Sequence, residues 1–454
     1  MNQRSEQDGL FGRTLSRRNA LRALGLTGVA VAAGGHLAGA AGPARPKRAA
    51  GLRRPRSADA GAQLAELLGI DPATAGGGET FKMGAVLAMT GAGSYYGQTM
   101  SRGIDLAVAH IAAAGGPQFE VKYLDHKSGD AQAGVDAMRE LGEAGYPAKL
   151  ASYCDNLGSM LPGTEQYQCF TLDGGGGTST FAQGKPFFWG TRAITPNDAI
   201  PGLLEYTKTV LPDAKTLGFI GWDLGEPTNS QIREDILAKF EAAGYEFNGL
   251  FELYPVGESN YSTLLPKIQA NEPDILIAYG SGQDPGHFAS QYYVSGIEAP
   301  FFGFEFTPDG LNASNGAYDE YGFTFAADYF DESVGVSPLA KLFISEYQAA
   351  YDDEFPDFYA ANFYENTLVM WEVIRRVIEG GGDFNSGADL DAAFQENLTA
   401  VSVYGGDEST IGSYTLDPVT HSVIQRPMGV FNYKDGAVTP LAFFDIAAAD
   451  FRLA

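Results

Sequence analysis

The feature that most constrains the fold is a regular alternation of short apolar runs and amphipathic stretches, which begins near residue 81. The first unit is an apolar run of strand length at 82–89 (KMGAVLAM), a Gly-rich loop, and a stretch at 100–114 whose apolar residues recur at helical spacing. The unit repeats, with strands expected at 119–124, 148–153 and 169–172 and helices at 130–145 and 155–168. Strands that alternate with helices predict parallel sheets with helices on both faces.

The alternation restarts near residue 198, as though a second lobe begins there. It then predicts strands at 216–221, 247–253, 274–279 and 300–304, with helices between them. Further on, the segment 412–444 is typical of antiparallel strands, with turns at Asp417-Pro418 and Lys434-Asp435-Gly436. We therefore expect an α/β protein with two doubly wound parallel-sheet lobes.

The charge is divided unevenly along the chain. Residues 1–57 hold 11 of the 30 basic residues and only two of the 56 acidic ones, Glu6 and Asp8. The rest of the chain has 19 basic and 54 acidic residues, a net charge of −35. A body this acidic repels phosphate backbones and anionic membrane surfaces, so neither is an expected partner.

The first 41 residues have the pattern of an export signal. Ser16-Arg17-Arg18-Asn19 is a twin-arginine pattern, a mildly apolar run without charges follows at 23–34, and Ala38-Gly39-Ala40 offers a small-residue cleavage site. Together they resemble a Tat signal, which implies a periplasmic or extracellular location. The alternative is a disordered basic tail. We expect residues 42–80 to be a flexible linker with one short helix near 60–69.

The cysteines, Cys154 and Cys169, are expected to be buried thiols rather than a disulfide. A helix of about ten residues separates them and is roughly 15 Å long. The Cα atoms of a disulfide must lie within about 7 Å of each other.

No enzymatic motif is convincing. The five histidines lack zinc-ligand spacing, and neither a Walker A motif nor a G-x-S-x-G elbow is present. The loop at 91–97 (GAGSYYG) with Asp125 is similar to a dinucleotide fingerprint, but it is one residue too long. Tyr95 and Tyr96 also occupy the place where a pyrophosphate needs bare backbone. We therefore expect no enzyme, cofactor or metal, and keep a dinucleotide-dependent enzyme as an alternative.

Several short motifs follow one another along the chain: 84–97 (GAVLAMTGAGSYYG), 123–130 (YLDHKSGD), 188–192 (FWGTR), 302–305 (FGFE) and 358–361 (FYAA). In this order they resemble type I periplasmic substrate-binding proteins, specifically the leucine/isoleucine/valine-binding receptors of ABC importers. The resemblance covers about residues 81–444.

The resemblance implies two lobes joined by three hinge crossings. Lobe one would be 81–198 plus 329–410, and lobe two 199–328 plus 411–444, with 445–454 as a C-terminal tail. A small solute would be trapped by closure of the cleft, and the closed monomer would dock on the membrane permease. A ligand-sensing module with the same fold is a further alternative.

The resemblance also implies where ligand-binding residues lie. In lobe one they are Tyr96 as an aromatic wall, Asp155 and Asn156 after the third strand, Gly176, Gly177 and Thr178 after the fourth, and Asp198 at the first crossing. In lobe two they are Glu226, Gly282 and Glu305, with Glu305 pairing with an ammonium group.

The site departs from the family pattern at two acids. Asp155 stands where the family has Ser, so Asp155 and Glu305 would face one cleft and disfavour a carboxylate there. A cationic, amide-like or polyhydroxyl ligand is then an alternative to a simple branched-chain amino acid. Asp155 could instead serve only as a helix N-cap, a role that Asp favours.

Overall fold

The structure is a computed structural model that describes residues 57–91, 93–152, 154–175, 182–192, 196–446 and 450–454. Of these, the side chains of residues 57–58, 154–157 and 196–198 are not described. Residues 57–454 lie within one compact unit.

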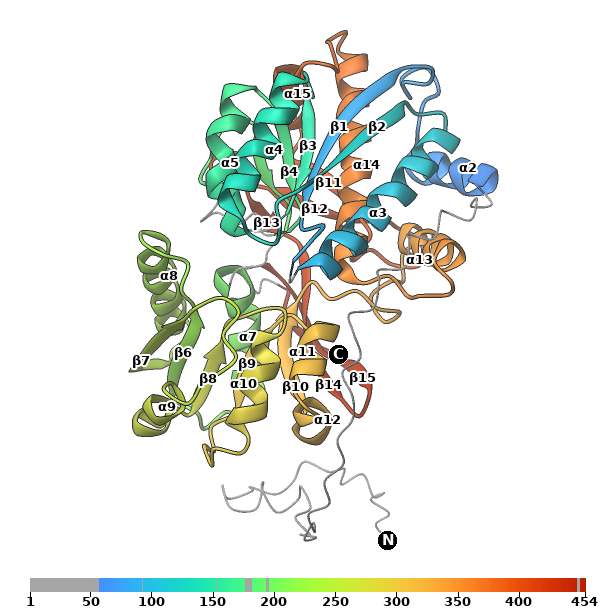
Figure 1. Cartoon of the computed structure of the whole chain (residues 1–454). Coiled ribbons are helices and arrows are strands. Elements are labelled where there is room, and N and C mark those ends of the chain that lie inside the picture. The colour runs from blue at the N-terminus through green and yellow to red at the C-terminus, as the bar shows by residue number, and fades with distance from the viewer. Residues whose placement is uncertain (1–56, 92, 153, 176–181, 193–195, 447–449) are drawn as a thin grey trace, which may run out of the picture. The chain divides into compact units, whose positions relative to one another are not determined.

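The first sheet has five parallel strands in the order β2-β1-β3-β4-β5 (Figure 1). These strands are β1 (Thr80–Leu87), β2 (Gln118–Asp125), β3 (Ala148–Ala151), β4 (Phe170–Asp173) and β5 (Phe188–Gly190). Between them run α3 (Ser94–Ala113), α4 (Ala131–Glu143) and α5 (Cys154–Gln166). Every described residue of β3, β4 and β5 is buried, as expected for strands covered on both faces.

The second sheet has eight strands in the order β16-β15-β14-β10-β9-β8-β6-β7. Its parallel part consists of β6 (Thr216–Trp222), β7 (Glu246–Tyr254), β8 (Ile275–Ala278), β9 (Phe301–Phe304) and β10 (Phe323–Ala327). The antiparallel part consists of β14 (Pro427–Lys434), β15 (Ala437–Asp445) and β16 (Arg452–Leu453).

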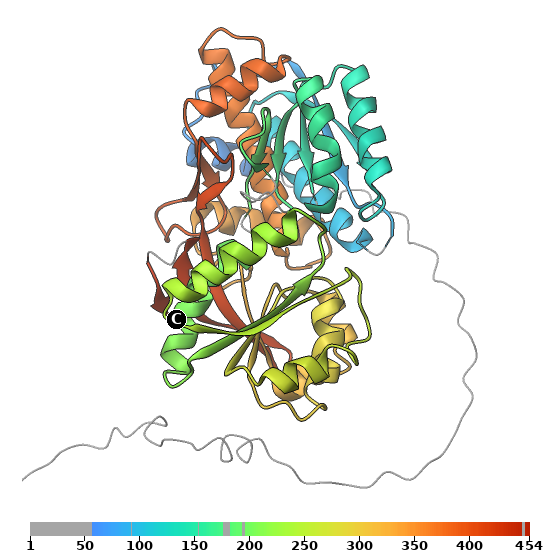
Figure 2. The same cartoon turned by 90° about the vertical axis from the view of Figure 1, so that its left-hand side faces the viewer.

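Helices lie on either side of the second sheet (Figure 2). They are α7 (Pro196–Val210), α8 (Thr228–Ala242), α9 (Leu265–Asn271), α10 (Asp284–Tyr292), α11 (Pro308–Ala313) and α12 (Ala317–Tyr321). Side chains alternate between the two faces: Phe219 and Ile277 belong to one apolar cluster, and Ile220 and Leu276 to the other.

The chain returns to the first sheet through α13 (Pro338–Ala350), α14 (Phe358–Glu379) and α15 (Gly387–Gln395). The longest of these, α14, is buried along most of its length and packs against α3. Its N-cap is Asp357, whose carboxylate accepts a hydrogen bond of 2.8 Å from the Ala360 backbone N–H. A small third sheet follows, formed by β11 (Thr399–Ser402), β12 (Gly412–Leu416) and β13 (Val423–Gln425).

The parallel five-stranded sheet and the parallel part of the second sheet confirm the expected α/β class and doubly wound architecture. Three segments differ from the expectations. Part of the expected linker is folded: α2 (Ser57–Leu67) buries Leu64 against the core and contacts α3, and the Trp371 indole donates to the Ala75 carbonyl at 2.9 Å. The segment 411–444 divides between the third and second sheets, and the expected tail contains β16. Cys169 is a buried free thiol, while the Cys154 side chain lies outside the described set.

Within the described part of the chain, none of the helices combines the length and apolarity that a membrane span requires.

Candidate functional site

A cavity of about 330 Å³ is lined by residues from the elements around both large sheets. From the first sheet's side come Tyr96 at the start of α3, Gly175 after β4, and Tyr359 in α14. From the second sheet come Trp222 at the end of β6, Ser281 after β8, and Glu305 after β9. These positions are carboxyl ends of parallel strands and the first turns of helices, which is where α/β proteins bind ligands.

Several aromatic side chains line this cavity. Tyr96 packs against Tyr359 with ring centroids 4.9 Å apart, and Trp222 meets Tyr279 edge-on at 5.3 Å. Gly282 lines the same cavity with a φ of +66°, and a Cβ added there would lie 3.1 Å from the Tyr96 hydroxyl. A glycine at this position permits both the left-handed backbone and the approach of Tyr96.

Glu305 lines the cavity but is already engaged by the protein. Its Oε1 receives a hydrogen bond of 2.7 Å from Arg192 Nη2, and its Oε2 accepts from the hydroxyls of Ser281 and Tyr359. Its backbone is left-handed, with φ of +59°, a conformation that costs a residue other than glycine about 1–3 kcal/mol. Both carboxylate oxygens of Glu305 therefore already have protein partners, and one of them forms an ion pair with Arg192.

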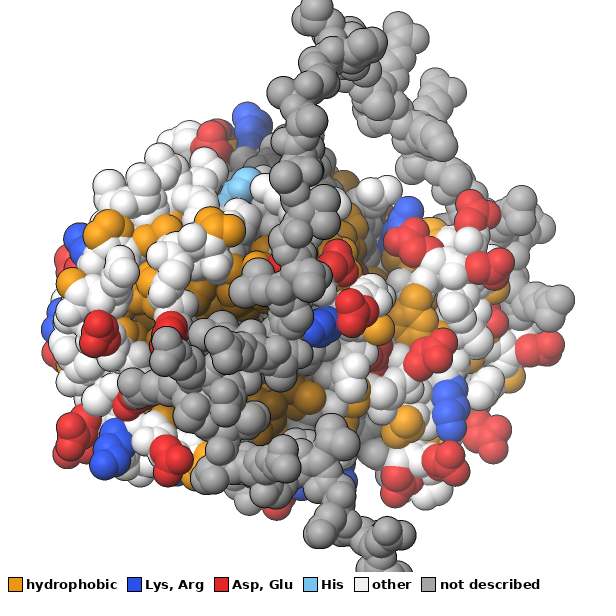
Figure 3. Space-filling view, turned by 90° about the horizontal axis from the view of Figure 1, so that it is seen from below, with side chains coloured by type: hydrophobic (Ala, Val, Ile, Leu, Met, Phe, Trp, Pro, Cys, Tyr) orange, Lys and Arg blue, Asp and Glu red, His pale blue; other side chains and the backbone are white. Residues whose placement is uncertain are grey.

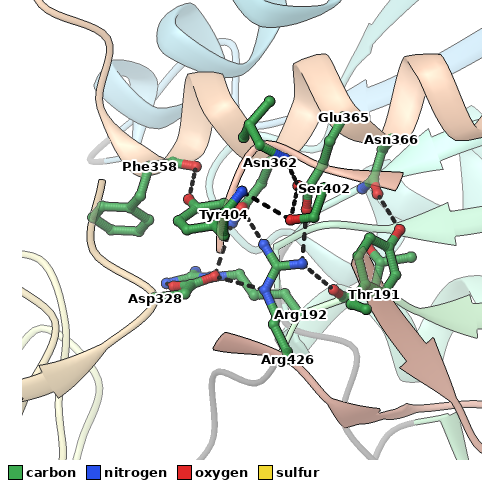
Figure 4. A network of polar contacts seen from close by, with 12 residues as sticks. Thr191, Arg192, Asp328, Phe358, Asn362, Glu365, Asn366, Ser402, Tyr404 and Arg426 are labelled. Atoms are coloured by element: carbon green, nitrogen blue, oxygen red, sulfur yellow. Dashed lines mark hydrogen bonds and ion pairs between the residues drawn. The ribbon is translucent and has the colours of Figure 1, made fainter. Parts of the chain in front are cut away.

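Arg192 belongs to a buried ionic network (Figure 4) that joins the three chain segments between the sheets. Arg192 follows β5, Asp328 follows β10, and Arg426 lies between β13 and β14. Asp328 accepts from Arg192 Nε at 3.0 Å and lies 3.5 Å from Arg426 Nε. The three side chains that pair here come from the three segments in which a hinge would have to bend.

The network extends into α14. Arg426 forms an ion pair of 2.7 Å with Glu365 and donates to the Asn362 amide oxygen at 2.7 Å. Burial would raise the pKa of Asp328, but Arg192 and Arg426 hold it below its ordinary value. Glu365 differs, because burial raises its pKa against the pull of Arg426.

Two further acids line the cavity in the second sheet's half. Asp284 Oδ2 accepts from the Trp222 indole and from the Gly257 backbone N–H, both at 2.8 Å. Asp309, in the first turn of α11, has no hydrogen-bond or ion-pair partner among the described residues. Burial raises the pKa of each carboxyl. Among the described lining residues, His287 is the only one with a basic side chain.

The structure brings together three of the predicted site residues, since Tyr96, Gly282 and Glu305 all line the cavity. Glu226 is not among the lining residues, and its carboxylate accepts from the Ser230 hydroxyl at 2.7 Å. Asp155 and Asn156 lie in α5 and Asp198 lies in α7, with side chains outside the described set. Gly176, Gly177 and Thr178 also lie outside the described residues. The ligand-binding roles assigned to all of these residues remain predictions.

Asp125, the acid that accompanies the dinucleotide-like loop at 91–97, accepts hydrogen bonds from neighbouring parts of the protein. Asp125 Oδ1 accepts from the backbone N–H groups of Met89 and Lys127 at 3.0 and 2.7 Å, and Oδ2 accepts from the Thr90 hydroxyl at 2.6 Å. Partial burial opposes ionisation of Asp125, but these hydrogen bonds lower its pKa overall. The carboxylate therefore anchors the loop after β1. No cluster of His, Cys, Asp or Glu among the described residues could hold a metal ion.

The sequence reasoning missed several residues of the site. The sequence identifies Arg192 only as part of the motif at 188–192, because its partners Glu305 and Asp328 lie more than a hundred residues away in sequence. Asp309 carried a local signal, because it follows Pro308 at the start of a helix beside a predicted strand end. Trp222 could have been found as the last residue of an apolar strand.

The chain matches the family described as periplasmic binding protein over residues 80–437. A comparison with curated proteins found no match.

Solved structures with the same fold include three solute-binding proteins. The branched-chain amino acid transporter substrate-binding protein LivJ from Streptococcus pneumoniae, in complex with isoleucine, is 17% identical with a TM-score of 0.65 over 81% of this chain and 99% of that one. The leucine-binding protein LivK from Thermotoga maritima is 17% identical with a TM-score of 0.67, over 80% and 98%. A solute-binding protein from R. palustris, in complex with benzoate, is 18% identical with a TM-score of 0.65, over 81% and 96%.

These likenesses establish the fold, and the family match spans most of the chain. The chain belongs to the periplasmic binding protein family, and it has the type I fold of the substrate-binding protein LivJ and the leucine-binding protein LivK.

Proposed function

We propose that this protein is the extracytoplasmic receptor of an ABC importer and captures an amino-acid-like or amide-like small solute in the cavity between its two sheets. The observation that carries the proposal is the cavity itself, which draws its lining from both sheets. It adjoins the segments that connect the sheets, because Glu305 lines it and pairs with Arg192. A solute held there would tie the two halves together, and this couples binding to a hinge motion.

The proposal includes export and delivery. The Tat-like pattern in residues 1–41 supports an extracytoplasmic location. After capture, the two lobes would present a joint surface to a membrane permease. The receptor would act as a monomer and without a cofactor, because capture by closure needs no covalent chemistry.

Thermal unfolding of the full chain with a panel of amino acids, amides and amines tests this function. A solute at about 100 times its Kd should stabilise the protein by roughly 2.7 kcal/mol. Solute carried through purification would be released by denaturation and identified by mass spectrometry. A panel without any shift, together with no released solute, would contradict the proposal.

Two matched variants locate the binding. Val256 lines the cavity with 55% of its surface exposed, whereas Val294 is 78% exposed and is not a lining residue. Val256→Trp adds bulk to the cavity without removing a core side chain, so we expect it to weaken solute binding at least tenfold. Val294→Trp should leave binding unchanged. Equal effects of the two variants would place the solute elsewhere.

A further inference from the structure

The cavity's charge indicates what kind of solute it takes, an inference that rests on the proposed function. Its described lining contains the acids Asp284, Glu305 and Asp309 and a single basic residue, His287. Arg192 lies next to Glu305 and pairs with Glu305 and Asp328 through Nε and Nη2, both partners being buried like itself, while its Nη1 has no hydrogen-bond partner among the described residues. The described lining therefore carries an excess of negative charge.

The three acids are not equally available to a ligand. Glu305 is bound by Arg192, Ser281 and Tyr359, which engage both of its oxygens. Asp284 is held through Oδ2 by Trp222 and Gly257. Asp309 is half-buried, and among the described residues nothing donates a hydrogen bond to it or forms an ion pair with it. Partial burial makes the ionised form of a carboxylate without a partner less favourable, and a neighbouring cation would offset this cost.

Aromatic faces add to the attraction for a cation. Tyr96, Trp222, Tyr279 and Tyr359 line the same cavity from both sheets. Burial raises the pKa of Tyr96, and the nearby negative charges of Glu305 and Asp309 raise it further. Aromatic rings attract organic cations through their faces, and the attraction grows when the site excludes water.

We propose that the solute carries a cationic amine, and that the Asp309 carboxylate and the surrounding aromatic rings hold this amine in place of Glu305. The rest of the solute then packs against the apolar part of the lining, which includes Leu224 and Val256. Glu305 keeps its role as the partner of Arg192. The solute thus differs from benzoate, the anion bound by the R. palustris protein.

Two matched sets of compounds test the class of solute on the full chain. Benzylamine, benzyl alcohol and benzoate share one ring, and isopentylamine, isopentanol and isovalerate share one branched chain. Within each set only the charge of the end group changes. In isothermal titration we expect the amine of at least one set to bind at least tenfold more tightly than its alcohol and its acid. If the alcohol or the acid of a set binds as tightly as its amine, the inference of a cationic solute is wrong, although the proposed solute-binding function of the cavity still stands.

Two variants with the same chemical change test the residue. Asp309→Asn keeps the shape of the side chain and removes its charge, so amine binding should weaken about tenfold or more, the scale of one charge-assisted contact. Glu298→Gln removes a charge from an exposed residue that is not in the lining, and should have no effect. Amine binding that survives Asp309→Asn within twofold, or is lost only in Glu305→Gln, would overturn the assignment to Asp309.

Failure of all six compounds would also overturn the inference. Solute released from the denatured protein then decides the fate of the proposed function. If a neutral or acidic solute is released, the proposed receptor function stands and only the amine inference fails. If no solute is released and no compound of the thermal panel shifts the melting temperature, both proposals fail.

Discussion

At the residue scale, Asp328 is the centre of the ionic network that connects the sheets. It is 1% exposed and pairs with Arg192 and Arg426, which come from two other segments. Removing one partner from a buried ion pair leaves an uncompensated charge, which typically costs about 3–5 kcal/mol. We expect Asp328→Asn to lower the free energy of unfolding by that amount in urea titrations. Asp213→Asn, the same change at an exposed residue, should be neutral.

The pH dependence of this effect has a defined sign. Because Arg192 and Arg426 hold the folded-state pKa of Asp328 below the ordinary value of about 3.9, the unfolded chain binds the proton first as pH falls. The stability that Asp328 contributes is therefore fully present above that value and is lost as pH drops through the folded pKa. A stability difference between wild type and Asp328→Asn that grows toward acid would contradict this account.

At the element scale, the contact between α3 and α14 depends on Gly103. A Cβ at this position would lie 2.2 Å from the Ala360 carbonyl oxygen, which is backbone and has little freedom to move. Gly103→Ala should therefore destabilise the protein by about 1–3 kcal/mol, although alanine favours helices by about 1 kcal/mol. Gly158 in α5 has open space around it, so Gly158→Ala should stabilise the protein slightly. Thermal melts that rank the two variants in the opposite order would refute this packing.

Helices and strands could be predicted from the sequence where their hydrophobic periodicity is strong. The apolar runs of β1 to β4 and the helical spacing of α4 identify those elements within about two residues, whereas α3 begins at Ser94, six residues before the expected start at residue 100. The helix near 60–69 was expected, but its docking through Leu64 was not, since Ala- and Gly-rich sequence is also typical of linkers. The short β16 depends on its pairing with β15 and has almost no signal of its own.

The site was less predictable than the fold. Tyr96, Gly282 and Glu305 came from a resemblance and do line the cavity, yet the partner of Glu305 could not be read from the sequence. Arg192 and Asp328 are 136 residues apart, and only the fold brings them within hydrogen-bond distance. Pairs of this kind need tertiary structure, because periodicity reports only which face of an element is buried.

At the scale of the whole molecule, acidic side chains outnumber basic ones over the described surface, as the face in Figure 3 illustrates. This agrees with the 54 acidic and 19 basic residues after residue 57. Such a surface attracts cations and repels anions over distances up to about a Debye length, roughly 8–10 Å in physiological salt. The long-range field and the lining of the cavity therefore favour the same class of solute.

The central claim is that one solute is held by residues of both sheets at once. A crystal structure of the full chain with its tightest-binding amine measures this directly. The account predicts a solute in the cavity that contacts Tyr96 from the first sheet's side and Trp222 from the second, with its amine at Asp309. A solute bound outside this cavity, or touching residues of one sheet alone, would contradict it.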